Sequence, residues 1–230
     1  MEQKHMFTNK MIADLLIPVV LEQLLNSIMG TADTMMVSNV GSAAISAVSL
    51  VDSINVLVIQ VFAALAAGGT IICSQYMGQK NVKNATDAAK QLIFIITTIA
   101  VTLTVICVVF QIPLLHLIFG KVEAEVMSNS EVYFLYTALS FPFIALFNAG
   151  SSVFRAQENT RLPMTISVIS NIMNIVGNAI LIFGFQMGVA GAALSTLVSR
   201  IFCAVVVMYF LRNPKEKICV RDYTKIRPDG

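Results

Sequence analysis

Six long apolar segments, separated by short polar ones, make up most of the chain. Each has about 20 or more mostly apolar residues, the length at which a helix crosses the hydrocarbon core of a bilayer. They cover residues 12–37, 48–73, 92–115, 132–154, 163–184 and 189–211. Because a membrane-crossing segment satisfies its own backbone polar groups only as a helix, the pattern predicts an all-α membrane protein with six transmembrane helices.

The first segment has a polar stripe along one helical face. At 100° per residue, Glu22, Asn26 and Asp33 fall within an arc of about 40°. A charged side chain at the centre of a membrane costs about 2.5–3.5 kcal/mol on insertion scales, so it turns toward partner helices or a cavity. The stripe therefore predicts a pocket-facing surface, with Asp33 as the leading candidate for a proton, ion or cation site.

A second stripe lies on the fifth segment. Ser167, Asn171, Asn174 and Asn178 fall within an arc of about 60°. Such residues can form hydrogen bonds between helices, each worth roughly 0.6 kcal/mol. The other interpretation is that this face meets the acidic face of the first helix and lines a hydrated pocket. Four polar side chains on one stripe favour the pocket.

The remaining intramembrane charges are few. Arg200, near the centre of the sixth segment, needs a partner or water at that depth, and Glu22 is a candidate for an ion pair with it. Asp14 and Asp52 lie near the ends of their segments. We therefore expect these two aspartates at the membrane interface.

Two prolines interrupt apolar segments. Pro18 frees the backbone carbonyl of Asp14, and Pro142 frees that of Ala138, because proline has no N–H to donate four residues back. Prolines at membrane depth mark kinks whose freed groups are satisfied by neighbours. Pro18 is thus either a static kink or a hinge for alternating access.

Composition and charge set the class and the orientation. Hydrophobic residues make up 57% of the chain and charged residues 12%, whereas soluble domains have about 25% charged residues. Of the 15 Lys and Arg residues, all except Lys121 and Arg200 lie on one side, in residues 1–11, 74–91, 155–162 and 212–230. By the positive-inside rule, we expect a plasma-membrane protein with both termini of this segment in the cytoplasm. Residues 1–211 are expected to form one six-helix lobe, followed by a basic cytoplasmic linker or tail at 212–230.

Motifs of soluble chemistry are absent from the sequence. It has no Walker A sequence, no dinucleotide fingerprint and no HExxH motif. Its four cysteines form no CxxC pair, so neither a metal site nor a disulfide framework is predicted. We expect no enzyme, no cofactor and no nucleic-acid partner. Any uphill transport must then draw on an ion gradient or on a further partner.

Several motifs occur in a characteristic order. Pro18 is followed by Ala32-Asp33-Thr34, then by SQYMGQKN at residues 74–81 and FRAQENTRLPM at residues 154–164. The segment NIMNIVGNAILIFG at 171–184 precedes GVAGAALST at 188–196. Their order and spacing resemble the multidrug and toxic compound extrusion (MATE) family of cation-coupled antiporters, over nearly the whole chain.

The resemblance implies a fold of twelve helices in two six-helix lobes around a central cleft, of which this chain would be the N-terminal lobe. It also implies efflux of small organic, often cationic, compounds in exchange for protons or sodium ions, with the ion bound at Asp33. Asn174, Asn178 and Thr196 would belong to the polar network around Asp33. Many family members have aspartate where this chain has Asn178, so Asp33 is expected to be the only acid of its immediate network.

In the mechanism that the resemblance implies, an ion bound at Asp33 neutralises the site and changes the packing of the first helix, with bending at Pro18. Three alternatives stay open. A lipid-linked-sugar flippase of the same broader superfamily would line the cleft with several basic residues, whereas only Arg200 lies within the apolar segments here. A half-transporter would need a second six-helix lobe, in the same chain or in a partner. A membrane-embedded enzyme would need a catalytic constellation, which the sequence lacks.

Overall fold

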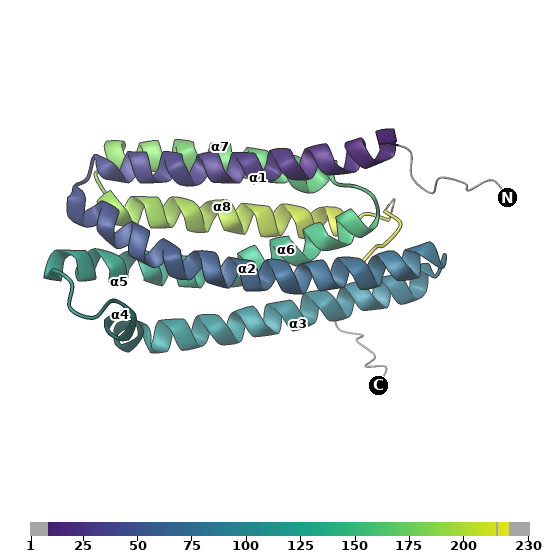
Figure 1. The fold of residues 1–230 in the computed structure, drawn as a ribbon, viewed down its shortest axis with the longest axis horizontal. Helices are drawn as coiled ribbons and strands as arrows, with labels where there is room; N and C mark the ends of the chain where they lie inside the picture. The colour runs from purple at the N-terminus through teal and green to yellow at the C-terminus, as the bar shows by residue number, and fades with distance from the viewer. Residues whose placement is uncertain (1–8, 215, 221–230) are drawn as a thin grey trace.

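The computed structural model describes residues 9–214 and 216–220, except for the side chains of residues 9–11, 26 and 29 (Figure 1). The described chain is built of helices, of which the long ones run roughly parallel or antiparallel to one another. They are α1 (Asn9–Ser38), α2 (Ser42–Gly78), α3 (Val82–Val109), α4 (Gln111–Phe119), α5 (Ala124–Leu139), α6 (Phe141–Ala156), α7 (Arg161–Asn178), the π-helical turn η1 (Ala179–Gly184) and α8 (Gly188–Leu211).

Six membrane-crossing elements account for the six predicted segments. α1, α2, α3, α7 with η1, and α8 are each long and apolar enough to span a bilayer. The sixth element is the pair α5 and α6, which are bent by 41° relative to each other at the break between them. The predicted all-α fold with six transmembrane helices is therefore confirmed.

Among the differences between the helix limits and the predicted segments, two concern the end of α3 and the start of α2. The third segment was predicted to run to residue 115, but α3 ends at Val109 and a separate short helix, α4, starts at Gln111. α2 begins at Ser42 rather than near residue 48. Both differences arise because hydropathy marks the apolar core of a helix and not the residue at which the helix begins or ends.

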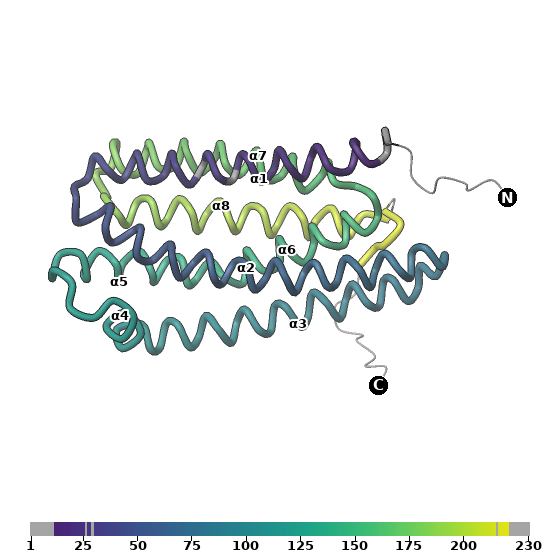
Figure 2. Tube along the Cα trace, viewed as in Figure 1, coloured from purple at the N-terminus to yellow at the C-terminus, as the bar shows by residue number. Residues whose placement is uncertain are grey.

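The helices pack in a defined order around the middle of the bundle. α1 lies along α7, and α8 packs against α7, α6 and α5. α2 packs against α6, α3 and α5, and the tube view shows α3 at the edge of the bundle with α4 at its end (Figure 2). This arrangement turns one face of α1, α2, α5, α6, α7 and α8 toward a shared interior.

Pro18 lies inside α1, where the loop between α6 and α7 satisfies the carbonyl that it frees. The carbonyl oxygen of Asp14, which Pro18 leaves without its helical donor, accepts a hydrogen bond from Thr160 Oγ1 at 3.5 Å. The Asp14 carboxylate also forms an exposed ion pair with Arg161 at 3.6 Å. The first part of α1 is thus tied to the start of α7.

The bend between α5 and α6 is supported in the same way. Pro142 lies in the first turn of α6, and the freed carbonyl oxygen of Ala138 accepts a hydrogen bond from Thr104 Oγ1 of α3 at 3.1 Å. Ser140, buried at the break itself, donates its hydroxyl to the carbonyl oxygen of Thr137 at 2.5 Å. A threonine of a neighbouring segment thus satisfies each of the two proline-freed carbonyls.

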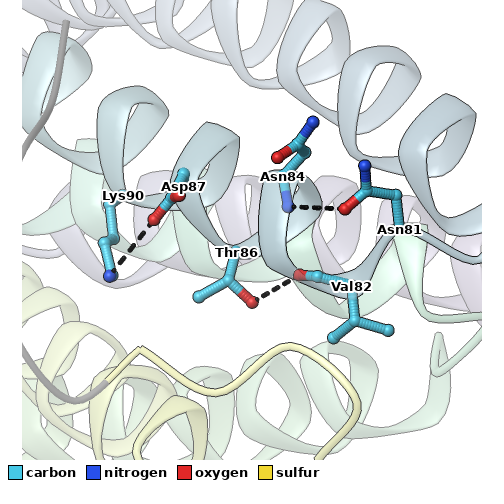
Figure 3. A network of polar contacts seen from close by, with 6 residues as sticks. All are labelled: Asn81, Val82, Asn84, Thr86, Asp87 and Lys90. Atoms are coloured by element: carbon cyan, nitrogen blue, oxygen red, sulfur yellow. Dashed lines mark hydrogen bonds and ion pairs between the residues drawn. The ribbon is translucent and has the colours of Figure 1, made fainter.

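The turn from α2 to α3 is fixed by local polar contacts (Figure 3). Asn81 caps α3, since its Oδ1 accepts a hydrogen bond from the backbone N–H of Asn84 at 3.1 Å. Further along the helix, Thr86 Oγ1 donates to the carbonyl oxygen of Val82 at 2.8 Å, and Lys90 pairs with Asp87 at 3.4 Å. Asp87 and Lys90 therefore pair with each other near this end of the bundle.

The first part of the predicted tail packs against the helices. Ile218 and Val220 are fully buried. The backbone N–H of Ile218 donates to Gln157 Oε1 at 2.9 Å, and that of Val220 donates to the carbonyl oxygen of Leu211 at 3.0 Å. Residues 221–230 lie outside the described part, so the division of the chain after residue 211 stays a prediction.

Candidate functional site

A cavity of about 670 Å³ lies among α1, α2, α5, α6, α7 and α8. Its volume is typical of pockets for small organic molecules, and its lining combines apolar side chains with a few polar ones. The charged side chains that line it are Glu22, Asp33, Asp52, Arg155 and Arg200.

Asp33 of α1 faces the asparagine stripe of α7. Asn178 Nδ2 donates a hydrogen bond to Asp33 Oδ1 at 2.5 Å. Asn174 and Asn178 are fully buried, and Asn178 Oδ1 has no hydrogen-bond partner. The acidic face of α1 and the asparagine face of α7 therefore meet, as the two stripes predicted.

The Asn174 amide has two orientations that fit its neighbours, because an asparagine presents a donor on one side and an acceptor on the other. In one, Asn174 Nδ2 donates to Thr196 Oγ1 and its oxygen accepts from Asn178 Nδ2, each at 3.2 Å. In the other, its nitrogen donates to Asp33 Oδ1 at 2.9 Å and its oxygen accepts from Thr196 Oγ1 at 3.2 Å. Asp33 thus receives a hydrogen bond from one or from two amides.

The other residues predicted around Asp33 lie as follows. Thr196 of α8 lines the cavity, and its hydroxyl also lies 3.0 Å from the carbonyl oxygen of Ala192. Asn171 lines the cavity one turn before Asn174. The side chain of Asn26 lies outside the described residues. The binding roles of these residues stay predictions.

Asp52 belongs to the cavity and not to the membrane interface, so that expectation is wrong. Its Oδ1 accepts hydrogen bonds from Tyr133 of α5 and from Asn55 Nδ2, each at 3.2 Å. α2 begins at Ser42, so Asp52 lies almost three turns into the helix and reaches the lining. Asp33 is the only acid in its own hydrogen-bonded network among the described residues, but the cavity as a whole holds a second aspartate.

The predicted ion pair between Glu22 and Arg200 does not form within the described chain. Glu22 Oε2 instead pairs with Arg155 at 2.9 Å, because the long Arg155 side chain extends from the last turn of α6 into the cavity. Arg200 donates from Nη1 to Ser140 Oγ at 2.6 Å, at the break between α5 and α6. Its charge also interacts electrostatically with Asp33 and Asp52.

Sequence reasoning missed Asp52, Tyr133 and Arg155 as cavity residues. The spacing of Asp52 and Asn55, three residues apart on one helix, was a usable signal, because such residues are neighbours on a helix surface. No comparable signal marks Arg155, which lies at the end of its segment and reaches Glu22 only through the length of its side chain.

Residues 18–180 match the family model MatE. The chain belongs to the MatE family. This MatE chain is 34% identical over 191 residues to an uncharacterised transporter, YisQ, of Bacillus subtilis, covering 80% of the chain and 41% of YisQ. It is 28% identical over 214 residues to a probable multidrug resistance protein, NorM, of Thermotoga maritima, covering 90% of the chain and 45% of NorM. The family resemblance drawn from the sequence motifs is thereby confirmed.

The fold of this MatE chain also matches solved structures. A transporter of the MOP superfamily from Pyrococcus furiosus superposes with a TM-score of 0.88 at 22% identity, covering 96% of this chain and 48% of the solved one. At that identity the likeness concerns the fold alone. The chain spans about half the length of the relatives that it matches.

Proposed function

We propose that this MatE chain forms one six-helix lobe of a secondary active efflux transporter. Its cargo would be small organic, often cationic, compounds, exported in exchange for protons or sodium ions. The observation that carries the proposal is a carboxylate, Asp33, in a membrane-embedded cavity of about 670 Å³, bound by an asparagine of a facing helix. The name of the Thermotoga relative, a probable multidrug resistance protein, supports the same activity.

The charge of the cavity supports a cationic cargo. Glu22 and Arg155 neutralise each other as an ion pair, which leaves the carboxylates Asp33 and Asp52 and the guanidinium of Arg200. With both aspartates ionised, these three groups carry a net charge of minus one. A cavity with low-dielectric walls focuses such a field and concentrates ions of the opposite sign.

The same charge balance counts against a lipid-linked-sugar flippase. A diphosphate carries several negative charges and requires clustered arginines or lysines to replace its water. Here Arg155 is paired with Glu22, and Arg200 shares the cavity with two aspartates. No unbalanced basic cluster lines the described cavity.

Asp33 is the proposed site of exchange between the coupling ion and the cargo. An ionised Asp33 accepts N–H bonds from Asn178 and Asn174, and it attracts an organic cation. A protonated Asp33 would donate its O–H instead, and Asn178 can accept it after its amide turns, because its oxygen has no other partner. A sodium ion would draw on oxygen atoms of Asp33, Asn174 and Thr196. Either ion neutralises Asp33 and weakens the binding of a cation, which gives the differential affinity that coupling requires.

Movement of α1 at Pro18 would connect this exchange to alternating access. Pro18 lies between two anchors, since Asp14 is held by Thr160 before it and Glu22 by Arg155 after it. Bending between these anchors would shift Asp33 relative to α7 without unfolding the helix. Transporters of this kind commonly work by rocking of one lobe against another around a central site. We therefore propose that a second six-helix lobe, in the same chain or in a partner, completes the transporter.

Asp33→Asn tests the proposed function. Expressed from its complete gene, the variant should lose ethidium efflux driven by a proton or sodium gradient in membrane vesicles, because the amide cannot ionise. Asp87→Asn is the matched control, since Asp87 is a half-exposed aspartate paired with Lys90 at the end of the bundle and away from the cavity. If Asp33→Asn exports ethidium as fast as Asp87→Asn, with equal amounts of protein in the membrane, Asp33 is not the coupling site.

A further inference from the structure

A second carboxylate and amide pair lies in the same cavity as Asp33 and Asn178. Asp52 of α2 accepts a hydrogen bond from Asn55 Nδ2 at 3.2 Å, and Tyr133 donates to the same carboxylate oxygen at 3.2 Å. Asn55 and Tyr133 are buried, whereas Asp52 is only partly buried and lines the cavity. The hydrogen bonds described for Asp52 all fall on Oδ1.

The two pairs share an uncommon feature. Among the described residues, neither Asn178 Oδ1 nor Asn55 Oδ1 has a hydrogen-bond partner, and both atoms are buried. An unpaired buried carbonyl is unfavourable, and a native structure that keeps one calls for an explanation. In both pairs the amide donates its N–H to the ionised carboxylate, and after turning it can accept the O–H of the protonated carboxyl with its oxygen. Each asparagine is therefore suited to both protonation states of the aspartate beside it.

We propose that Asp52 of α2 is a second proton-binding group of the cavity. It takes the place of an acid on α7, where this chain has Asn178, which cannot ionise. This proposal rests on the efflux function proposed above and deepens it, since it also defines the cargo as a monovalent cation exchanged for two protons. Each proton binds reversibly to a carboxylate oxygen from water and returns to water, with no covalent change elsewhere.

A second acid strengthens the expulsion of a cation that the neutralisation of Asp33 begins. The titratable and charged groups that line the cavity on helices packed against α2 are Glu22 and Asp33 on α1, Tyr133 on α5, Arg155 on α6, and Arg200 and Cys203 on α8. α3 contributes no such group to the lining.

With Tyr133 and Cys203 neutral and Glu22 paired with Arg155, the net charge depends on Asp33, Asp52 and Arg200. It is minus one when both aspartates are ionised and zero when only Asp33 takes a proton. It becomes plus one when both take a proton, because Arg200 stays charged. Only two acids therefore convert an attractive cavity into a repulsive one for a monovalent cation.

Proton release on cargo binding tests the role of Asp52. The protein, expressed from its complete gene and purified in detergent, is titrated with ethidium in weakly buffered solution across a pH series, and released protons are counted with a pH indicator. We expect Asp52→Asn to release one proton fewer per bound ethidium than the wild type at its maximum. Adding Asn178→Asp to Asp52→Asn should restore that proton, because it returns a second carboxylate beside Asp33. Asp87→Asn should match the wild type.

The outcomes separate this proposal from the function on which it rests. If Asp33→Asn lowers the proton count and stops efflux while Asp52→Asn releases as many protons as Asp87→Asn, the role of Asp52 is wrong and the efflux function stands. If Asp33→Asn changes neither quantity, the efflux function itself fails. Should Asp52→Asn not fold, the wild type alone decides, since a maximum of one released proton or fewer overturns the proposal and a larger number supports it. In that case an infrared difference spectrum must also show two protonated carboxyl groups lost on ethidium binding.

Discussion

At the scale of single residues, the two arginines of the cavity are stabilised in different ways. Arg155 has a carboxylate partner, Glu22, at 2.9 Å, whereas Arg200 is held by the hydroxyl of Ser140. The side chain of Arg155 is 30% exposed and that of Glu22 only 5%. An arginine at a helix end can reach water with its guanidinium, but a buried glutamate cannot. The two partners therefore depend on the ion pair to different degrees.

This difference predicts an asymmetry between substitutions. Arg155→Met leaves the buried Glu22 charge uncompensated and should lower the free energy of unfolding by about 3–5 kcal/mol. Glu22→Gln leaves Arg155 free to turn toward water, so its effect should be smaller, about 1 kcal/mol. The double variant should be more stable than Arg155→Met alone. Thermal unfolding of the four proteins in detergent gives the double-mutant cycle, and additive effects would show that the pair contributes nothing.

Helical periodicity decided which residues of the site could be predicted from the sequence. Glu22, Asp33 and the asparagines of α7 could be assigned to one interior because residues at helical spacing share a face. Asp52 was assigned to the interface because the apolar segment that contains it begins about six residues after the helix does. The partner of Glu22 could not be predicted, since a pairing between distant segments is not encoded in the period of either one.

At the scale of elements, close packing of η1 and α7 on α8 positions the network around Asp33. A side chain at Gly191 would meet the backbone of Leu181 at 3.1 Å, and one at Gly177 would overlap the Ser195 side chain. Ser195 Oγ in turn donates to the carbonyl oxygen of Asn174 at 2.8 Å. Small residues at such contacts let membrane helices approach each other. The close contact between α7 and α8 therefore holds Asn174 beside Asp33.

Gly191→Ala is expected to disturb this contact. The backbone of Leu181 cannot rotate away as a side chain can, so the helices must separate slightly, at a cost of about 1–3 kcal/mol. Ethidium affinity should fall together with the unfolding temperature, because α8 carries Thr196 into the cavity lining. Gly68→Ala in α2, where nothing lies within 4 Å of the added carbon, is the control and should retain both. Equal behaviour of the two variants would contradict the packing role.

The sequence predicted the membrane-crossing helices more completely than the points at which they break or bend. Hydropathy predicted the six membrane-crossing segments, because a run of about twenty mostly apolar residues is typical of a transmembrane helix. It gave neither the separate helix α4 nor the 41° bend between α5 and α6. Pro142 predicted a kink in that segment, but the partner that stabilises it, Thr104 on α3, depends on tertiary packing.

At the scale of the whole molecule, basic residues gather at one end of the bundle. The α2–α3 turn, the α6–α7 loop and the end of α8 lie together at the end where α1 begins, and they carry Lys83, Arg161 and Arg212 (Figure 1). The other end holds the α1–α2 turn and the loop before α5, with Lys121. By the positive-inside rule, we expect the first end to face the cytoplasm.

Orientation decides which side of the membrane lies nearer to Asp33. Asp33 lies five residues before Ser38, so it is about 7–8 Å from the end of α1 on the side that carries few basic residues. If that end faces outward, the coupling ion reaches Asp33 from outside, as efflux requires. In a variant without its own cysteines, Lys121→Cys should then react with a membrane-impermeant maleimide in intact cells. Lys83→Cys should react only after the membrane is opened. The reverse pattern would place Asp33 near the cytoplasm and would contradict the predicted orientation.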